Sequence, residues 1–214
     1  MLELGAKMLI AYLLGALLGS LILGRLRGFD IRSMGSGNAG ATNALRTQGK
    51  LFAILVLLID IAKGVIAVRW LPAAALPGVG IDPELPREWL TLACGVAVIV
   101  GHVYPVWFSF RGGKGAATVV GVVAGLELRL LVPMLLCWFV VLLLTGYVSL
   151  ATMLAGLALV AAVHVLEPND LPLLIFCWLV TAFVIYTHRS NIGRMRSGTE
   201  NRVRRLWLFR SRTA

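Results

Sequence analysis

The sequence predicts an all-α polytopic membrane protein with seven transmembrane helices, its N-terminus outside and its C-terminus cytoplasmic. Of its 214 residues, 59% are hydrophobic and only 14% are charged, a composition far from that of a soluble globular domain. A helix needs roughly 20 apolar residues to cross a bilayer, so the chain has room for about six to eight crossings and little else. The few charges are unbalanced, with a net charge of +10, and their positions indicate which loops share one side of the membrane.

Seven apolar runs, separated by charged or polar residues, are the candidate transmembrane helices. They cover residues 4–23, 51–71, 89–105, 115–126, 130–144, 147–166 and 171–187. The stretch from 115 to 144 could be one long helix or a tight pair, because Glu127, Arg129 and Pro133 divide it. We expect the first run to be retained rather than cleaved, since it lacks a small-residue exit and Arg25 and Arg27 follow it. Residues 1–214 are thus expected to form a single integral-membrane domain.

The distribution of charge favours a pair of helices over residues 115–144 and predicts how the protein is oriented in the membrane. Loops on the cytoplasmic side of a membrane are enriched in Lys and Arg, and fifteen of the twenty basic residues lie in segments 25–50, 111–114 and 189–212. All three segments fall on one side only if 115–144 crosses the membrane twice, which places the N-terminus outside. The inside then has fifteen basic and two acidic residues, a net charge of +13. The outside has four basic and seven acidic residues, a net charge of −3.

Other features of the apolar runs are expected to be structural. Asp60 and Lys63, three residues apart in the second run, are interpreted as a structural ion pair rather than a proton relay. Small residues at a four-residue spacing predict helix packing on two ridges. These ridges consist of Ala11, Gly15 and Gly19, and of Gly121 and Gly125. The three cysteines have no metal-binding spacing and are expected to be buried thiols, so no metal and no cofactor is expected. They are Cys94, Cys137 and Cys177.

The first polar segment, residues 34–46, is a glycine-rich basic loop. Its glycines match G-x-G-x-x-G, but a dinucleotide fingerprint requires a preceding buried strand and a βαβ unit, and here a basic loop precedes it. Closely spaced glycines let backbone amides converge on an anion, and Ser36, Thr42 and Arg46 add donors. The segment therefore favours an anion-binding loop, with a flexible interfacial loop as the alternative.

The second polar segment precedes the fourth apolar run. It is not a P-loop, because Phe108 stands at the first glycine position and Gly115 at the Ser/Thr position. Gly112, Gly113 and Gly115 nevertheless surround Lys114 at the expected start of a helix, where free amides and the helix dipole attract phosphate. Charges that only orient the protein would not account for three glycines around one lysine.

The third polar segment follows the last run and contains His188 and Asn191. If the helix continues, these side chains share one face at the membrane boundary, although a lone histidine at a helix end is more often a capping residue. Further along the tail, Trp207, Leu208 and Phe209 among arginines could lie on anionic lipid. Three polar basic segments on one membrane face indicate binding of more than one anionic group at a lipid boundary.

The three segments resemble the signature blocks of the bacterial acyl-phosphate:glycerol-3-phosphate acyltransferase family. The blocks are residues 35–46, 101–115 and 188–192 with 198–200, and their order and spacing match over essentially the whole chain. The resemblance implies transfer of a fatty acyl group from acyl phosphate to the sn-1 hydroxyl of glycerol 3-phosphate, giving lysophosphatidic acid and phosphate in the first acylation of phospholipid synthesis. It also implies a bacterial cytoplasmic (inner) membrane enzyme, an active site facing the cytoplasm, and donor supply by an acyl-carrier-protein:phosphate acyltransferase. No nucleic acid partner is expected.

The chemistry of the residues agrees with this reaction, because both substrates carry phosphate and acyl phosphate has a good leaving group. We expect Lys114 and nearby amides to hold the departing phosphate and Arg46 to bind glycerol 3-phosphate. His188 and Asn191 would orient the hydroxyl, and either His188 or the substrate phosphate takes its proton. The expected catalytic residues are Ser36, Lys114, His188 and Asn191. The expected substrate- and phosphate-binding residues are Gly37, Asn38, Thr42, Asn43, Arg46, Gly112, Gly113, Arg189 and Glu200.

Two other classes of function make different demands on the sequence. Acyltransferases that use acyl-CoA or acyl carrier protein typically carry His-x4-Asp, and this pattern is absent from the sequence. The residues five positions beyond His102, His164 and His188 are Trp107, Asn169 and Gly193. An anion channel or a transporter for a phosphorylated solute could also use basic glycine-rich loops and is the alternative function.

Overall fold

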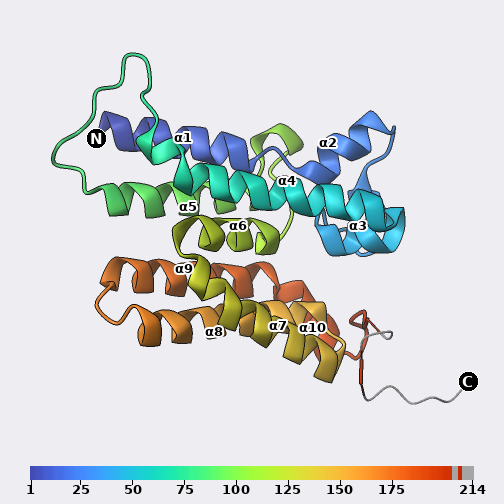
Figure 1. Ribbon diagram of the computed structural model, residues 1–214. Helices are drawn as coiled ribbons and strands as arrows, with labels where there is room; N and C mark the ends of the chain where they lie inside the picture. Colours follow the sequence, from blue (N-terminus) through green and yellow to red (C-terminus); the bar gives the residue numbers. More distant parts are fainter. Residues whose placement is uncertain (204–206, 209–214) are drawn as a thin grey trace, which may run out of the picture. The chain divides into compact units, whose positions relative to one another are not determined.

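The computed structural model describes residues 1–203, 207 and 208, and these residues form ten α-helices joined by loops and short 3₁₀ turns (Figure 1). The chain forms two compact units, Met1–Glu127 and Leu128–Ala214. The first unit contains α1 (Leu2–Gly15), α2 (Gly19–Leu26), α3 (Ala41–Gln48), α4 (Lys50–Arg69), α5 (Arg87–Val103) and α6 (Ala116–Leu126). The second contains α7 (Leu131–Thr145), α8 (Val148–Leu166), α9 (Leu171–Thr187) and α10 (Arg189–Arg196).

Each of the seven apolar runs is helical, and several of the helices have the length of a membrane span. Among the described residues, four segments are long and apolar enough to cross a membrane, and six are if each bent pair counts as one span. The four are Lys50–Ala73, Arg87–Phe108, Leu128–Thr145 and Val148–Leu166. The bent pairs are α1 with α2 and α9 with α10, whereas α6 has only eleven residues. The structure also separates α6 from α7 at Glu127, so the stretch 115–144 is two helices rather than one.

The sequence predicts one continuous helix for the first run. In the structure this helix breaks after Gly15. The chain bends by 48° between α1 and α2, and Leu18 has an extended backbone. A break inside an apolar segment leaves carbonyl groups without helical partners, which is costly away from water. Lys63 of α4 satisfies them, since its ammonium donates to the carbonyls of Gly15 at 2.8 Å and Leu17 at 3.3 Å.

The helices of the first unit lie close together (Figure 1), and glycines lie at two of their contacts. A Cβ at Gly15 of α1 would overlap the backbone carbonyl of Val98 in α5, and one at Gly121 of α6 would overlap that of Ile61 in α4. The helix packing predicted for both ridges is therefore confirmed at these positions. Such contacts need a residue without a side chain, because backbones can then approach directly.

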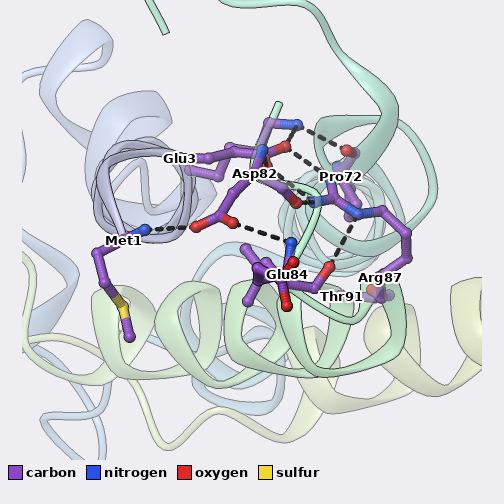
Figure 2. Close-up of polar contacts among 9 residues, drawn as sticks. Met1, Glu3, Pro72, Asp82, Glu84, Arg87 and Thr91 are labelled. Atoms are coloured by element: carbon purple, nitrogen blue, oxygen red, sulfur yellow. Dashed lines mark hydrogen bonds and ion pairs between the residues drawn. The ribbon is translucent and has the colours of Figure 1, made fainter. Parts of the chain in front are cut away.

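A polar cluster joins the N-terminus to the loop before α5 (Figure 2). The buried carboxylate of Glu3 accepts from Lys7 at 2.8 Å and from both terminal nitrogens of Arg87 at 2.7 and 2.8 Å. The terminal ammonium of Met1 lies 2.6 Å from Asp82. All four side chains belong to the set that the charge count assigns to the outside, so these residues do gather at one end of the unit.

In the second unit, α7 and α8 are joined by a tight turn in which Gly146 has a φ of 73°. The described part of the tail packs against this turn. Trp207 donates its indole N–H to the Leu144 carbonyl at 3.0 Å, and the amide of Leu208 donates to Leu143 at 2.9 Å. These bonds satisfy carbonyls at the C-terminus of α7. The predicted lipid contact of Phe209 lies outside the described residues.

Candidate active site

The first polar segment is organised by the side chain of Asn43, which is 1% exposed in the first turn of α3. Its Nδ2 donates to the carbonyls of Met34 and Asn38, both at 3.0 Å, and its Oδ1 accepts the amide of Ser36 at 2.9 Å. A Cβ at Gly35, whose φ is 57°, would collide with Oδ1. Asn43 therefore shapes the loop from within.

The side chains predicted to donate to an anion lie on the outer surface of this loop. Ser36, Thr42 and Arg46 are exposed, and the latter two belong to α3, whose N-terminal turn faces the loop. The amide of Gly37, by contrast, already donates to the Met34 carbonyl at 3.0 Å. The hydroxyls and the guanidinium are therefore accessible from solvent, whereas the Gly37 amide is engaged within the loop.

Arg32 connects the first polar segment to the second. Its Nη1 donates to the carbonyls of Phe108 and Arg111, both at 3.0 Å, while Nε and Nη2 bind the Asp30 carboxylate. The Arg32 guanidinium holds the pKa of Asp30 below its usual value. The two segments that the sequence placed on one side of the membrane are therefore neighbours in the first unit, joined by a side chain that the sequence analysis did not single out.

The second polar segment folds back over the end of α5. The amide of Gly112 donates to the Val103 carbonyl and that of Gly113 to the His102 carbonyl, both at 3.1 Å. Gly115, with a φ of 87°, is the N-cap of α6, and Lys114 lies half-buried directly before it. These two glycine amides are engaged inside the loop, contrary to the expectation that they face a phosphate.

His188 lies at the junction where α9 ends and α10 begins, and the helix axis bends there by 52°. The condition under which His188 and Asn191 would share one helix face, a straight continuation of the helix, is therefore not met, and the histidine is buried in the bend. Its Nδ1 lies 2.8 Å from the Val184 carbonyl. A carbonyl oxygen can only accept, so we assign the proton to Nδ1, which leaves Nε2 of the neutral ring as an acceptor. Arg189, also predicted to bind substrate, is exposed and lies over the Tyr186 ring at 4.3 Å.

Glu200 holds the third polar segment together. Its Oε1 accepts from Asn191 at 2.6 Å and from Ser149 of α8 at 2.9 Å, while Oε2 accepts from Arg194 at 2.7 Å. Burial raises the pKa of Glu200, but the hydrogen bonds from Asn191, Arg194 and Ser149 outweigh this effect and leave it below the usual value. A carboxylate so occupied orients Asn191 and would repel a phosphate, so the expected substrate contact of Glu200 has no support in this geometry.

The described residues contain no cluster of three or more His, Cys, Asp or Glu side chains that could hold a metal ion. The first unit brings together the segments containing Ser36, Arg46 and Lys114, and the second brings together His188, Asn191 and Glu200. Cations and hydroxyls such as those of the first unit suit the binding of phosphate esters. An imidazole beside an amide, as in the second unit, suits the activation of a hydroxyl.

Comparison with known proteins decides which family carries this arrangement. A family model described as "Glycerol-3-phosphate acyltransferase" matches residues 6–198. The chain belongs to this family. A glycerol-3-phosphate acyltransferase of Bacillus velezensis is 43% identical over 197 residues, which cover 92% of this chain and 95% of the relative. One of Bacillus subtilis is 42% identical over 201 residues, which cover 94% of this chain and 96% of the relative.

The family is also represented among solved structures. The chain resembles the crystal structure of PlsY (YgiH), an integral membrane glycerol 3-phosphate acyltransferase, in its glycerol 3-phosphate form. The TM-score is 0.80 and the sequence identity 33%, with 93% of this chain and 94% of the other covered. The lysophosphatidic acid form of PlsY gives a TM-score of 0.78 over the same coverage.

Three residues at the family's polar segments escaped the sequence analysis. Arg32 was counted only as an orienting charge, Ser149 was not distinguished from other helical serines, and His102 was considered only as a start for His-x4-Asp. A signal for His102 does exist, since it lies at the end of an apolar run, ten residues before the glycine pair.

Proposed function

We propose that this protein transfers a fatty acyl group from acyl phosphate to the sn-1 hydroxyl of glycerol 3-phosphate. The products are lysophosphatidic acid and inorganic phosphate, and the reaction is the first acylation of phospholipid synthesis. The observation that carries this conclusion is the family match over residues 6–198, which includes Ser36, Lys114, His188 and Asn191.

In this proposal, each of the expected catalytic groups has one role in the reaction. The sn-1 oxygen attacks the acyl carbon, a new C–O ester bond forms, and the bond from the acyl carbon to the phosphate oxygen breaks. Phosphate leaves with the bonding electron pair, and the Lys114 ammonium stabilises the charge that develops on it. Nε2 of His188 takes the hydroxyl proton, and Asn191 orients the hydroxyl.

Five of the other expected residues divide into two groups in this proposal. Ser36, Thr42 and Arg46 contact phosphate from the exposed side of the first loop, and Arg46 binds glycerol 3-phosphate because a guanidinium can bind a phosphate group through two N–H donors. Asn43 and Glu200 are positioning residues, since their polar atoms are occupied by the loop and by Asn191, respectively.

We also propose that the chain is a single integral-membrane domain that crosses the membrane seven times, with its N-terminus outside. Support comes from the charge distribution, from the Glu3–Arg87 cluster of predicted outer residues, and from the Arg32 bridge between two predicted inner loops. The active site would then face the cytoplasm of a bacterial inner membrane. Acyl phosphate would reach it from an acyl-carrier-protein:phosphate acyltransferase.

An acyl-transfer assay on the purified protein tests this function. Release of phosphate from acyl phosphate should require glycerol 3-phosphate and match the formation of lysophosphatidic acid mole for mole, and acyl-CoA should not replace the donor. The opposite result is a protein that forms no lysophosphatidic acid but conducts phosphate or glycerol 3-phosphate across proteoliposomes. That outcome would establish the channel or transporter alternative.

A further inference from the structure

A buried group of charged and polar side chains from α4 and α5 lies next to the second polar segment, in the first unit. Asp60 and Lys63 of α4 and His102 of α5 are 0%, 3% and 2% exposed. Lys63 Nζ lies 2.9 Å from Asp60 Oδ1 and 2.9 Å from His102 Nδ1. The ion pair expected from the sequence is therefore present, but it includes a histidine that connects it to the glycine loop.

The lysine determines which nitrogen of the imidazole bears the proton. An ammonium group has three N–H donors and no acceptor, so Nδ1 of His102 accepts from Lys63. The Asp60 oxygen is 3.5 Å from Nδ1, a longer distance than that to Lys63. In the neutral ring the proton therefore lies on Nε2, an assignment that follows from the hydrogen-bond network.

The Nε2 side of the ring lies directly against Gly113. A Cβ added to Gly113 would collide with Nε2, and one added to Gly112 would collide with the His102 carbonyl. The backbone amides of both glycines donate to the last turn of α5, as described above. The loop that carries Lys114 is thus supported by the imidazole below it and by the α5 carbonyls.

We propose that His102 is a positioning residue that sets the place of Lys114 through the Gly112–Gly113 backbone, and that Lys63 holds its ring. This inference rests on the proposed function, in which Lys114 binds phosphate. Burying an ion pair is costly compared with apolar packing of similar volume. The free-energy cost of burying Asp60 and Lys63 is offset if the lysine both satisfies the carbonyls at the α1–α2 break and holds the imidazole against the Gly112–Gly113 loop. A shift of about 1 Å in a group that contacts the reacting atoms can lower turnover by roughly 100-fold.

Two substitutions at one position separate positioning from packing. H102N keeps a polar group near Nδ1 but nothing at the place of Nε2, whereas H102Q reaches that place with an amide. H164N, at an exposed histidine in the last turn of α8, is the matched control. We expect H102N to lower kcat/KM about tenfold or more and to raise the phosphate concentration needed for half-inhibition. H102Q should recover much of both values, and the melting temperatures should equal that of H164N.

The inference is overturned if H102N has wild-type kinetics, or if H102N and H102Q lose activity equally and in proportion to lost folded protein. Should H102N fail to fold, G113A tests the same contact with the histidine intact, since its methyl group would displace the loop from Nε2. G113A should reproduce the weaker phosphate inhibition, and wild-type inhibition in G113A would contradict the proposal. Wild-type enzyme that makes no lysophosphatidic acid would instead disprove the proposed function, which keeps the two failures distinct.

Discussion

The side-chain oxygen of Asn43 accepts the backbone N–H of Ser36 at 2.9 Å, across seven residues of the first polar loop. The amide nitrogen of the same side chain binds two carbonyls of that loop, so one buried residue holds three points of its backbone. This arrangement gives Asn43 a different role from the exposed hydroxyl of Ser36. Substitution can separate loop organisation from substrate contact.

We predict that N43D destabilises the protein and lowers activity together. The new carboxylate could still accept from Ser36, but its second oxygen would face the Met34 and Asn38 carbonyls, which lose their donor. A buried polar group left without its partner costs about 1–3 kcal/mol. Thermal unfolding in detergent measures the loss, with exposed N169D as the control. Full stability combined with lost activity would instead make Asn43 a ligand-binding residue.

Two glycines of α1 should respond in opposite directions to the same added methyl group. A Cβ at Gly15 overlaps the Val98 backbone, whereas one at Gly5 has open space around it. We predict that G15A lowers the free energy of unfolding by about 1–3 kcal/mol through overpacking. G5A should raise it by roughly 0.5–1 kcal/mol, because alanine restricts the unfolded chain and favours the helix. Equal melting temperatures for the two variants would contradict close packing of α1 on α5.

Periodicity and charge could predict the helices because both depend on local sequence. Apolar runs of sufficient length have to be helical in a bilayer, since no other single segment satisfies its own backbone. The α1–α2 break could not be predicted in this way. It depends on Lys63, which lies 48 residues beyond Gly15 in the sequence. The sequence suggested Asp60 as the partner of this lysine. It did not suggest the other three, which are two backbone carbonyls and His102.

The candidate site shows the same division between residue type and placement. Sequence pattern selected Ser36, Asn43 and Glu200 alike, because all three are polar residues within signature blocks. Only the structure shows that the hydroxyl of Ser36 is exposed, that the amide of Asn43 is buried and that the carboxylate of Glu200 accepts from its neighbour in the third segment. Burial and hydrogen-bond partners are three-dimensional properties that a one-dimensional motif does not contain.

Glu200 should make the stability of the protein depend on pH. Because its pKa is lowered in the folded state, the carboxylate contributes stability that is fully present above its unfolded pKa, about 4.3. This contribution is lost as the pH falls through the folded value. We predict that E200Q has a lower melting temperature than wild type at pH 7 and that the difference shrinks below about pH 4. E84Q, which removes an exposed carboxylate, is the control. A difference that is independent of pH would show that the charge of Glu200 does not stabilise the segment.

Lys114 and Arg111 provide the last test, because each contributes one positive charge to the same loop. We predict that K114A lowers kcat by about 100- to 1,000-fold with unchanged thermal stability, as expected when a group that stabilises a developing negative charge is removed. R111A should change kcat/KM only a few-fold, since its exposed side chain attracts anions without a fixed contact while its carbonyl still accepts from Arg32. Exposed charges are screened at high ionic strength, so the effect of R111A should disappear in concentrated salt and that of K114A should persist. Near-normal turnover in K114A would remove Lys114 from the mechanism, and equal salt-sensitive losses in both variants would reduce it to general attraction of phosphate.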